Sequence, residues 1–414
     1  MLNPTGNYFY QLIDPDICFD WDTIEKVLVS SSEVEACSIC LYPPVAGRVT
    51  RCGHVFCLPC ILHHLESSEK SWQKCPVCCD PICEKDIKPI KITAGYSIKE
   101  GDLINLVLVQ RAHQSALAFP ISETWPLPEN VVSNYIKPDI SFIPWSSTPF
   151  AQSFARFMLA SPDYLLSEYD RDCKELEEAL LNATDRESAE EIRFIKKSKD
   201  RVDEERKRAE CQKTEEITLA LSTLDIMFEA IVKYNKKHKN TQHPQKQDGN
   251  DCLQKLGEKE NNKKHQQHNS PNDFYFYQKE DGQHVYLDPL DVRILKHEFG
   301  KYDQFPHCLQ AQVIGVQEST LDECLRRKNK YLNHVPLNCD VTFVEIDLKN
   351  IVSSKTLQAF SSELNARSKR REDKENQIES MRKQQPTCIE GGVTPDINHQ
   401  LNNREEQLTQ NKFS

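Results

Sequence analysis

Residues 37–78 read CSICLYPPVAGRVTRCGHVFCLPCILHHLESSEKSWQKCPVC, and this stretch decides the fold of the part of the chain around it. It holds seven cysteines and one histidine that could bind metal, in the order Cys37, Cys40, Cys52, His54, Cys57, Cys60, Cys75 and Cys78. Thiolate sulfur and imidazole nitrogen are the ligands that tetrahedral zinc prefers, and eight of them make two closed sites. The stretch therefore predicts two structural zinc ions with no coordination position left for a substrate.

The spacing of the ligands carries more information than their number. A gap of two residues lets both thiolates of a Cys-x-x-Cys turn reach one ion, so the stretch contains three such half-sites and a Cys-x-His pair as the fourth. Cys79 and Cys83 could each replace Cys78 as a ligand, but only Cys78 has the two-residue spacing from Cys75. A redox role for that last pair would leave the other ligands unexplained, so Cys78 is the predicted ligand.

The residues between the ligands fit a metal-dependent fold. Leu58 and Pro59 stand where a helix can begin, and Ile61, Leu62 and Leu65 follow at helical spacing. A segment of this size buries too little apolar surface to fold alone. Structural zinc contributes roughly 10–16 kcal/mol per site in small peptides. We therefore expect the metal to take the place of a hydrophobic core here.

The ligand order, with histidine only at the fourth position, resembles the RING finger, whereas a PHD finger has its histidine fifth. The resemblance implies that the pairs interleave, with Cys37, Cys40, Cys57 and Cys60 on one zinc and Cys52, His54, Cys75 and Cys78 on the other. RING fingers bind a ubiquitin-conjugating enzyme, and the positions that match their binding surface are Ile39, His64 and Pro76. The implied function is a RING-type E3 ubiquitin ligase, which brings ubiquitin on its partner enzyme to a lysine of a protein substrate. Such a ligase works through proximity and orientation and needs no nucleophile of its own.

Two positions depart from the pattern of many RING ligases. His64 stands where tryptophan is common, and Cys79 stands where a basic residue often follows the last ligand. These departures keep a competing hypothesis open. In that hypothesis the finger is a non-catalytic zinc scaffold that binds a protein or nucleic acid, for example in transcriptional regulation.

Further motifs are similar to the RING finger protein 10 family. In the finger they are Cys40-Leu41-Tyr42-Pro43-Pro44, Arg51-Cys52-Gly53-His54-Val55-Phe56-Cys57, Cys60-Ile61-Leu62-His63 and Lys74-Cys75-Pro76. In a second island they are Phe274-Tyr275-Phe276-Tyr277-Gln278, Glu280-Asp281-Gly282-Gln283-His284 and Tyr331-Leu332-x-His334. The resemblance covers residues 16–120 and 273–360. It implies small ribosomal subunit proteins as a substrate class and a role in transcriptional control.

The composition limits the class of protein further. Of the 414 residues, only 38% are hydrophobic and 28% are charged, so long parts of the chain are not expected to be globular. The net charge of -11 argues against a chain built overall to coat nucleic acid, while local basic clusters leave nucleic-acid binding open. We recognise no signal peptide and no apolar run of about 18 residues. The expected compartment is therefore a reducing one, the cytoplasm with the nucleus as a further location, and no membrane partner is expected.

The whole chain is predicted to contain a small cross-brace RING domain, a helical middle region and a C-terminal α+β domain, with a disordered linker and tail. Polar, low-complexity composition predicts the disordered parts. The expected order begins with an N-terminal flank at 1–36, the RING finger at 37–79 and a short β-rich extension at 80–120 packed beside the finger. An irregular connector at 121–150 and a helical or coiled-coil-like region at 151–235 follow. The chain then continues with a disordered linker at 236–272, the α+β domain at 273–349, and a charged helix with a disordered tail at 350–414.

The α+β domain shows clear local signals. Residues 274–277 and 285–287 flank a turn at Asp281-Gly282 and predict a β-hairpin. Asp288 before a first-turn proline, with Gly300 at the end, predicts a capped helix. Further strands are expected at 313–316 and 341–348, with a charged helix at 319–330. Sheet packing is the expected use of its aromatic residues, with stacking on a ligand or an RNA base as the alternative.

Overall fold

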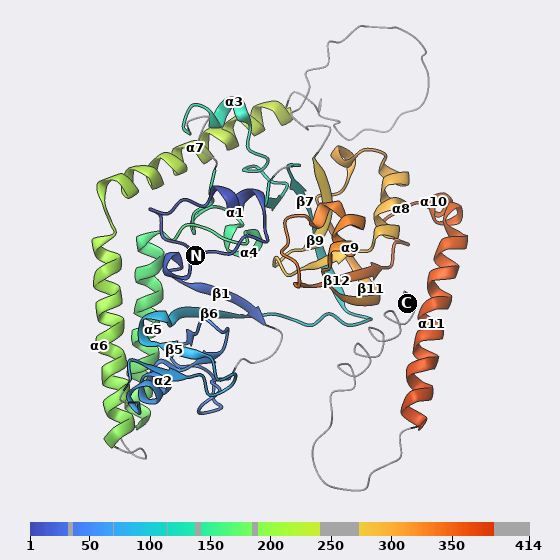
Figure 1. Cartoon of the computed structure of the whole chain (residues 1–414). Helices are drawn as coiled ribbons and strands as arrows, with labels where there is room; N and C mark the ends of the chain where they lie inside the picture. Colours follow the sequence, from blue (N-terminus) through green and yellow to red (C-terminus); the bar gives the residue numbers. More distant parts are fainter. Residues whose placement is uncertain are drawn as a thin grey trace. The chain divides into compact units, whose positions relative to one another are not determined.

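The computed structural model describes residues 1–31, 36–68, 70–113, 115–136, 142–183, 189–240 and 273–384. The chain divides into two units, residues 1–357 and residues 358–414. The first unit contains the finger, the helical region and the C-terminal sheet (Figure 1). The second contains α11 (Ser361–Gln384), a helix where the charged helix was expected. The rest of the expected tail, 385–414, lies outside the described residues.

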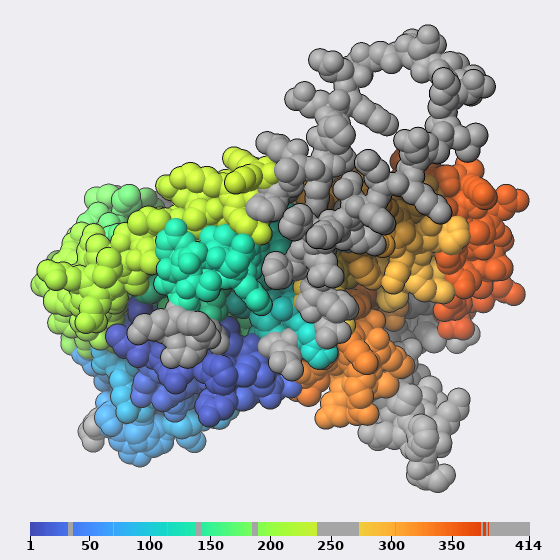
Figure 2. Space-filling model, turned by 90° about the horizontal axis from the view of Figure 1, so that it is seen from above, coloured from blue at the N-terminus to red at the C-terminus, as the bar shows by residue number. Residues whose placement is uncertain are grey.

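The finger belongs to a four-stranded sheet that includes the N-terminal flank. Its strand order is β1 (Val27–Ser31), β6 (Lys88–Ala94), β2 (Arg48–Val49) and β3 (Val55–Phe56). β1 runs parallel to β6, and the other pairs are antiparallel. β4 (Trp72–Lys74) and β5 (Pro81–Cys83) pair around the last two ligands. In Figure 2 the dark blue flank and the lighter blue finger accordingly lie side by side.

The helix expected after the third half-site is α2 (Leu58–Glu66). Pro59 occupies its first turn, where a missing N–H costs nothing, and Leu58, Ile61, Leu62 and Leu65 are buried. These residues belong to one core cluster that also contains Leu176 and Phe194 from the helical region. The finger therefore shares its apolar core with helices far along the chain.

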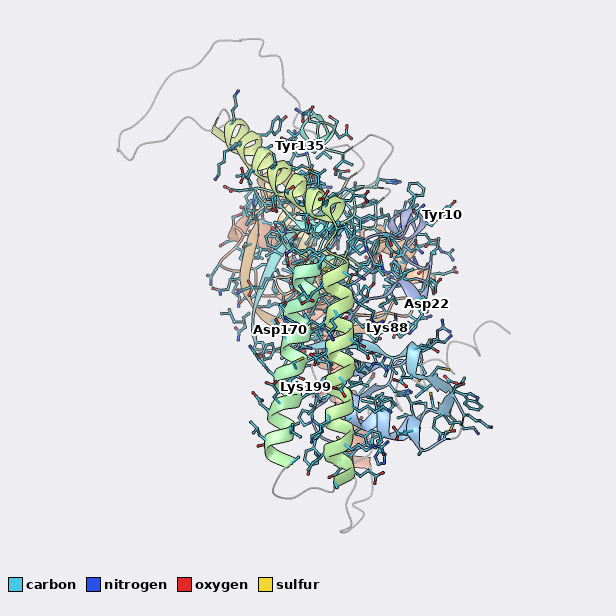
Figure 3. The ribbon with its side chains drawn as sticks, turned by 90° about the vertical axis from the view of Figure 1, so that its left-hand side faces the viewer. Tyr10, Asp22, Lys88, Tyr135, Asp170 and Lys199 are labelled. Atoms are coloured by element: carbon cyan, nitrogen blue, oxygen red, sulfur yellow. The ribbon has the colours of Figure 1, made fainter. Side chains whose placement is uncertain are left out.

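In its described residues the helical region contains α4 (Ala151–Phe154), α5 (Pro162–Ala183), α6 (Ala189–Cys211) and α7 (Glu215–Asn240). α5 and α6 form a helical hairpin within the region predicted to be helical, and they lie side by side in Figure 3 with Asp170 on one helix and Lys199 on the other. A coiled coil stays a prediction. Among the described helices, none is both long enough and apolar enough to span a membrane.

The start of the disordered linker at 236 is wrong, because α7 continues to Asn240. In this helix, buried residues pack in a core cluster with residues of the flank and connector, namely Leu224, Met227 and Ile231. This packing stabilises the helix, so that it continues into the polar residues after 235. Residues 241–272 of the predicted linker lie outside the described residues. The connector at 121–150 is irregular in its described part, apart from the short α3 (Glu129–Val132).

The C-terminal sheet is a small closed barrel. Its strand order is β11 (Cys308–Thr320), β12 (Asp340–Ile346), β10 (Val285–Leu287), β9 (Phe274–Lys279), β7 (Leu103–Arg111) and β8 (Ala118–Pro120). β11 also pairs with β7, so β11, β12, β10, β9 and β7 form a closed ring of strands. β8 pairs antiparallel with the last three residues of β7. The expectation that 80–120 packs as one extension beside the finger is therefore wrong, since β6 joins the finger but β7 and β8 join the barrel. Local composition cannot show this division, because it depends on pairing with strands far away in sequence.

The local predictions for the barrel are confirmed. β9 and β10 pair as an antiparallel hairpin. The Asp288 carboxylate accepts a hydrogen bond of 2.8 Å from the Leu290 N–H, and α8 (Pro289–Phe299) ends at Gly300, whose φ is +77°. β11 is longer than expected because it serves two partners, and α9 (Glu323–Lys328) is correspondingly shorter than the expected helix.

The aromatic residues of the barrel are used for packing, as expected. Phe276 and Tyr286 are buried together in its core, with ring centroids 5.8 Å apart. The Tyr275 ring stacks on Tyr302 at 5.0 Å, which leaves its face covered. The aromatic run therefore forms part of the fold and does not present a row of open stacking faces.

Candidate metal centre

The eight predicted ligands gather into two groups of four. One group contains Cys37, Cys40, Cys57 and Cys60, and the other contains Cys52, His54, Cys75 and Cys78. Within each group the candidate ligand atoms lie within 4.8 Å of one another. This confirms the interleaved arrangement, in which the first and third pairs share a site and the second and fourth pairs share the other. Two ions in these sites would cross-link four separate turns of the chain.

The distances within the groups fit tetrahedral zinc. Zinc–sulfur bonds of about 2.3 Å at tetrahedral angles place two sulfur atoms about 3.8 Å apart, and the Sγ atoms of Cys40 and Cys57 are 3.7 Å apart. In the second group, His54 Nδ1 lies 3.4 Å from Cys52 Sγ and 3.6 Å from Cys75 Sγ. The histidine therefore presents Nδ1 to the ion. Both donor sets suit zinc in closed, structural sites.

Two of the turns that carry ligands share one backbone pattern. In the first, the N–H of Leu41 donates to the carbonyl of Cys37 at 2.8 Å, and in the second the N–H of Cys79 donates to the carbonyl of Cys75 at 3.0 Å. Leu41 and Cys79 both adopt left-handed backbone conformations, with φ of 62° and 65°. Each turn thus closes tightly around its two thiols, and the residue after the second thiol accepts the backbone strain.

This pattern also explains why Cys78, and not Cys79 or Cys83, is the ligand. The left-handed conformation of Cys79 turns the chain away from the site, and its side chain is exposed. Cys83 lies in β5, where it pairs with Trp72. Neither belongs to a group of candidate metal ligands within the described residues. The choice made from spacing alone is confirmed.

In the first group, Cys37, Cys57 and Cys60 shift one another's pKa values in opposite directions. Hydrogen bonds with Cys57 and Cys60 lower the pKa of Cys37, and the hydrogen bond with Cys37 raises the pKa of Cys57 to about 12. Hydrogen bonds with Cys37 and Cys57 likewise raise the pKa of Cys60. One thiolate therefore forms at the expense of its neighbours. A divalent cation removes this conflict, because it binds thiolates directly and favours loss of every proton.

The three positions predicted to bind a conjugating enzyme lie around the two metal turns. The side chain of Ile39, between the first two ligands, is 39% exposed, and Pro76, between the last two, is exposed. His64, on α2, is half-buried, and its Nε2 lies 2.7 Å from the carbonyl oxygen of Lys74. The imidazole thus joins α2 to the chain just before the last metal turn.

Sequence reasoning missed other apolar residues on the same turns. Leu41 is 77% exposed, Tyr42 is 73% exposed and Val77 is 51% exposed. Leu41 and Tyr42 follow the first Cys-x-x-Cys pair, and Val77 lies inside the last one. Their position within a metal turn, where no helix or strand can bury them, is the signal that could have found them.

The helical hairpin of α5 and α6 contacts the finger through buried charged side chains. Arg48, on β2, is fully buried and donates hydrogen bonds to Asp172 on α5 at 2.8 Å and to Glu205 on α6 at 2.9 Å. Glu168 on α5 forms ion pairs with Lys26, just before β1, at 2.8 Å and with Lys91, in β6, at 2.7 Å. Sequence reasoning did not foresee this network, because isolated charged residues in a polar chain give no sign of burial.

A second contact joins α2 to α6 near the hairpin tip. The His63 ring stacks on Phe194 with centroids 4.6 Å apart, and Glu66 pairs with Arg193 and Lys197. His63 and His64 are neighbours on a helix, so their side chains point about 100° apart. The hairpin therefore contacts the His63 side of α2, while His64 on another side lies against the chain just before the last metal turn.

The geometry and ligand order define a C3HC4 RING finger. Residues 37–78 match the family model "Zinc finger, C3HC4 type (RING finger)". This is the class of domain that the cross-braced ligand groups form. The match covers the finger only, and the narrower resemblance to the RING finger protein 10 family stays a prediction.

Two relatives resemble nearly the whole chain. An uncharacterized RING finger protein of Schizosaccharomyces pombe is 29% identical, covering 97% of this chain and 59% of the relative. The E3 ubiquitin-protein ligase MAG2 of Saccharomyces cerevisiae is 24% identical, covering 92% of this chain and 55% of the relative. The chain thus spans somewhat more than half the length of these two relatives. A third, E3 ubiquitin-protein ligase BRE1-like 2 of rice, is 36% identical over 73 residues, which are 17% of this chain and 8% of the relative.

Proposed function

We propose that this protein is a RING-type E3 ubiquitin ligase. The observation that carries the proposal is the pair of closed metal sites beside an exposed apolar surface that includes Ile39 and Pro76. Closed sites offer no open position for a water or a substrate, so the metals themselves catalyse nothing. The function must then come from what the rigid surface binds. Similarity to MAG2 and to BRE1-like 2, both named as E3 ubiquitin-protein ligases, supports a conjugating enzyme as that partner.

In the proposed reaction the finger binds a conjugating enzyme that carries ubiquitin as a thioester. The amine of a substrate lysine attacks the thioester carbonyl, an isopeptide bond forms, and the thiol of the conjugating enzyme leaves. The finger contributes by holding the thioester in a reactive orientation, an effect of proximity that requires no nucleophile from this chain. Exposed Cys79 is accordingly assigned no catalytic role.

Each of the three surface positions has a distinct part in this proposal. Ile39 and Pro76 are held at fixed places by the metal ligands on either side of them, so both can pack against the partner with little loss of entropy. His64 acts mainly by shape, because its imidazole is already bonded to the carbonyl of Lys74. It thereby fixes the distance between α2 and the last metal turn, which form two sides of the binding surface.

Substrates and location are part of the same proposal. Small ribosomal subunit proteins are the proposed substrate class, on the resemblance to the RING finger protein 10 family. The cytoplasm is the proposed location, with the nucleus as a second one. In support, none of the described cysteines forms a disulfide, which suits a reducing compartment.

The test is an in vitro ubiquitination assay with a panel of conjugating enzymes. We expect ubiquitin chains with at least one enzyme, and a loss of at least tenfold in rate for Ile39→Ala. The matched control is Ile13→Ala, because Ile13 is 52% exposed on α1 (Phe9–Ile13), outside the finger. Its rate should equal that of the wild type.

The same assay distinguishes the competing hypothesis of a non-catalytic zinc scaffold. Absence of chains with every conjugating enzyme, while two zinc ions remain bound, would favour the scaffold. Equal activity of Ile39→Ala and the wild type would contradict the proposed binding surface. A nucleic-acid gel shift that persists in Ile39→Ala would point to a nucleic-acid partner instead.

A further inference from the structure

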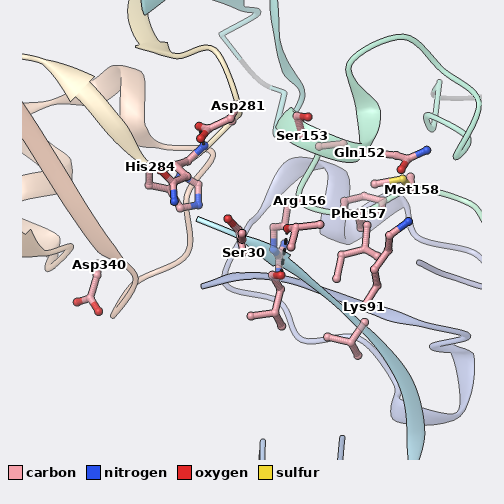
Figure 4. Close-up of a pocket in the computed structure, with 18 of the residues that line it drawn as sticks. Ser30, Lys91, Gln152, Ser153, Arg156, Phe157, Met158, Asp281, His284 and Asp340 are labelled. Atoms are coloured by element: carbon pink, nitrogen blue, oxygen red, sulfur yellow. Dashed lines mark hydrogen bonds between the residues drawn. The ribbon is translucent and has the colours of Figure 1, made fainter. Parts of the chain in front are cut away.

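A cavity of about 880 Å³ lies between β1 and the barrel. Figure 4 shows Asp281, His284 and Asp340 on its barrel side, Gln152 and Phe157 on the other, and Ser30 of β1 between them. The proposed ligase surface does not include any of the residues that line it. The cavity is therefore separate from the site described above.

One wall of the cavity is the open edge of a β-sheet. β1 is the first strand in the order β1-β6-β2-β3, so β6 covers one edge only. The carbonyls of Val29 and Ser31 accept hydrogen bonds from Thr93 Oγ1 and from the N–H of Gly95, on the side of β6. Alternate residues of a strand point their backbone groups to opposite sides. The N–H and C=O groups of Leu28 and Ser30 therefore face the cavity.

The structure already contains a short example of pairing at this edge. The Met1 amino group donates to the carbonyl of Lys26 at 2.7 Å, and the N–H of Lys26 donates to the carbonyl of Met1 at 3.4 Å. Lys26, Leu28 and Ser30 are alternate residues on the same edge. In the described part of the chain, Met1 completes this edge at Lys26, and no strand continues the pairing to Leu28 and Ser30.

The exposed edge lacks the features that usually prevent strand pairing. Proteins protect such edges with charged side chains, proline or bulges. Residues 27–31 read VLVSS, with neither charge nor proline, and the five pairs with β6 run in register without a bulge. The edge is also recessed in a cavity, where water competes less for its hydrogen bonds. Both features are those of a strand that receives another strand.

Charge on the barrel wall indicates which segment would fit. Asp281, Glu318 and Asp340 place three carboxylates there, of which Asp281 is paired with Lys279 at 2.7 Å. The backbone of Glu318 pairs with Thr342 of β12, but its side chain forms no hydrogen bond or ion pair with any residue that the structure describes. On the other walls, Lys91 is paired with Glu168 at 2.7 Å and the Arg156 guanidinium donates to the carbonyl of Ile17 at 3.2 Å. On the barrel wall the carboxylates of Glu318 and Asp340 form no ion pair with any described residue, so the unpaired charge of this wall is negative, while Arg156 on the facing wall keeps a positive charge.

We propose that this cavity binds an extended, basic segment of a partner protein, which pairs with β1 as an added strand. Its backbone would bond to Leu28 and Ser30, and its lysine or arginine side chains would face Glu318 and its acidic neighbours. Main-chain bonds of this kind give affinity, and the side-chain contacts give specificity. This binding activity is independent of the proposed ligase activity.

The direct probe is a blocked hexapeptide, acetyl-Val-Lys-Val-Lys-Val-Lys-amide with a fluorescent label, measured by fluorescence polarisation on the full chain. We expect saturable binding with Kd below 1 mM. The same peptide with alternate amide nitrogens methylated should bind at least tenfold more weakly, because it cannot complete the pairing. Absence of binding below 1 mM, or equal binding of the methylated peptide, would overturn the proposal.

Ser30→Pro tests the edge itself. Proline removes the N–H that faces the cavity while leaving the bonds between β1 and β6, and an edge strand tolerates it. We expect at least tenfold weaker peptide binding with the zinc content and thermal midpoint of the wild type. Undiminished binding by a folded Ser30→Pro protein would contradict the proposal.

Glu318→Lys tests the charge without touching the edge, so it decides the matter even if Ser30→Pro fails to fold. We expect this reversal to weaken binding of the basic peptide severalfold, and more at low salt than at high salt. The matched control is Glu216→Lys, an exposed carboxylate in the first turn of α7. Equal binding of the peptide by Glu318→Lys and Glu216→Lys would show that Glu318 does not attract the basic side chains, and it would overturn the proposed preference for a basic segment.

Discussion

The finger and the barrel are two solutions to the same problem of building a core. In the finger the strands β2 and β3 have two residues each, and the buried centre includes Cys37, Cys57 and Cys75, which are at most 3% exposed. In the barrel, β11 alone has thirteen residues, and the core is apolar, with Tyr286 and Val341 at most 1% exposed. The finger therefore depends on a ligand, and the barrel depends on strands that pair across long distances in sequence.

Removal of zinc should produce the largest difference in stability between the finger and the barrel. Structural zinc contributes roughly 10–16 kcal/mol per site in small peptides, far more than a finger of this size gains from burial. Chelation should abolish hydrogen-exchange protection in residues 48–66 and leave it in β9 and β12. Hydrogen exchange followed by mass spectrometry measures both regions in one sample. Protection that survives in the finger after complete loss of metal would break the comparison.

Loss of the Arg48 side chain should produce the next largest effect. Arg48→Met removes the buried cation that Asp172 and Glu205 share and leaves them only the more exposed Arg171 and Arg201, which should cost up to about 3–5 kcal/mol. Urea unfolding followed through a probe in the finger measures this loss. The control is Arg206→Met, which removes an exposed pair with Asp170 and should cost about 0–1 kcal/mol. Equal effects of the two variants would show that the hairpin does not support the finger.

The barrel should have its own sensitivity to acid, independent of zinc. Burial, together with the charge of Arg111, lowers the pKa of His334 to about 3, below the usual value of about 6.5. The unfolded chain then binds a proton below pH 6.5 that the folded barrel does not bind until about pH 3. Stability should therefore fall as pH decreases through this window, by about 2 kcal/mol between pH 7.5 and pH 5.

Urea unfolding at both pH values, followed through a resonance of the barrel core such as Val341, measures this dependence. The control variant is His334→Asn, which can still donate to the carbonyl of Tyr331, 3.0 Å from His334 Nδ1, but cannot titrate. Its stability should change less between the two pH values. A dependence as steep as that of the wild type would assign the acid sensitivity to another group.

The smallest effect concerns the backbone of the last metal turn. Cys79 has a left-handed backbone with φ of 65°, which glycine adopts without strain. Cys79→Gly should leave two zinc ions bound and stabilise the finger by up to about 1 kcal/mol. Cys79→Val should destabilise it. The loss of one zinc ion from Cys79→Gly, seen by metal analysis, would instead make Cys79 a ligand.

The finger could be predicted closely from the sequence because its constraints are local. Ligand spacing and the resemblance to the RING finger identified both donor sets, and Pro59 marked the start of α2. The same local reasoning found the cap at Asp288 and the hairpin of β9 and β10. Such signals depend on neighbouring residues, which the sequence shows directly.

The remaining features depend on distant contacts. Nothing near Leu106 indicates that it pairs with Lys279 and with Leu309, and so the sequence predicts the wrong neighbours for β7. Arg48 looks like any surface arginine until α5 and α6 cover it. The open edge of β1 likewise emerges only when the strand order is known.

Zinc stoichiometry tests the central claim, that two cross-braced zinc ions build the surface, most directly. Native mass spectrometry of the full chain should show two zinc ions in the wild type. Cys57→Ser should lose the ion of the first group, and Cys75→Ser should lose that of the second. Fewer than two zinc ions in the wild type, or two retained in both variants, would contradict the account.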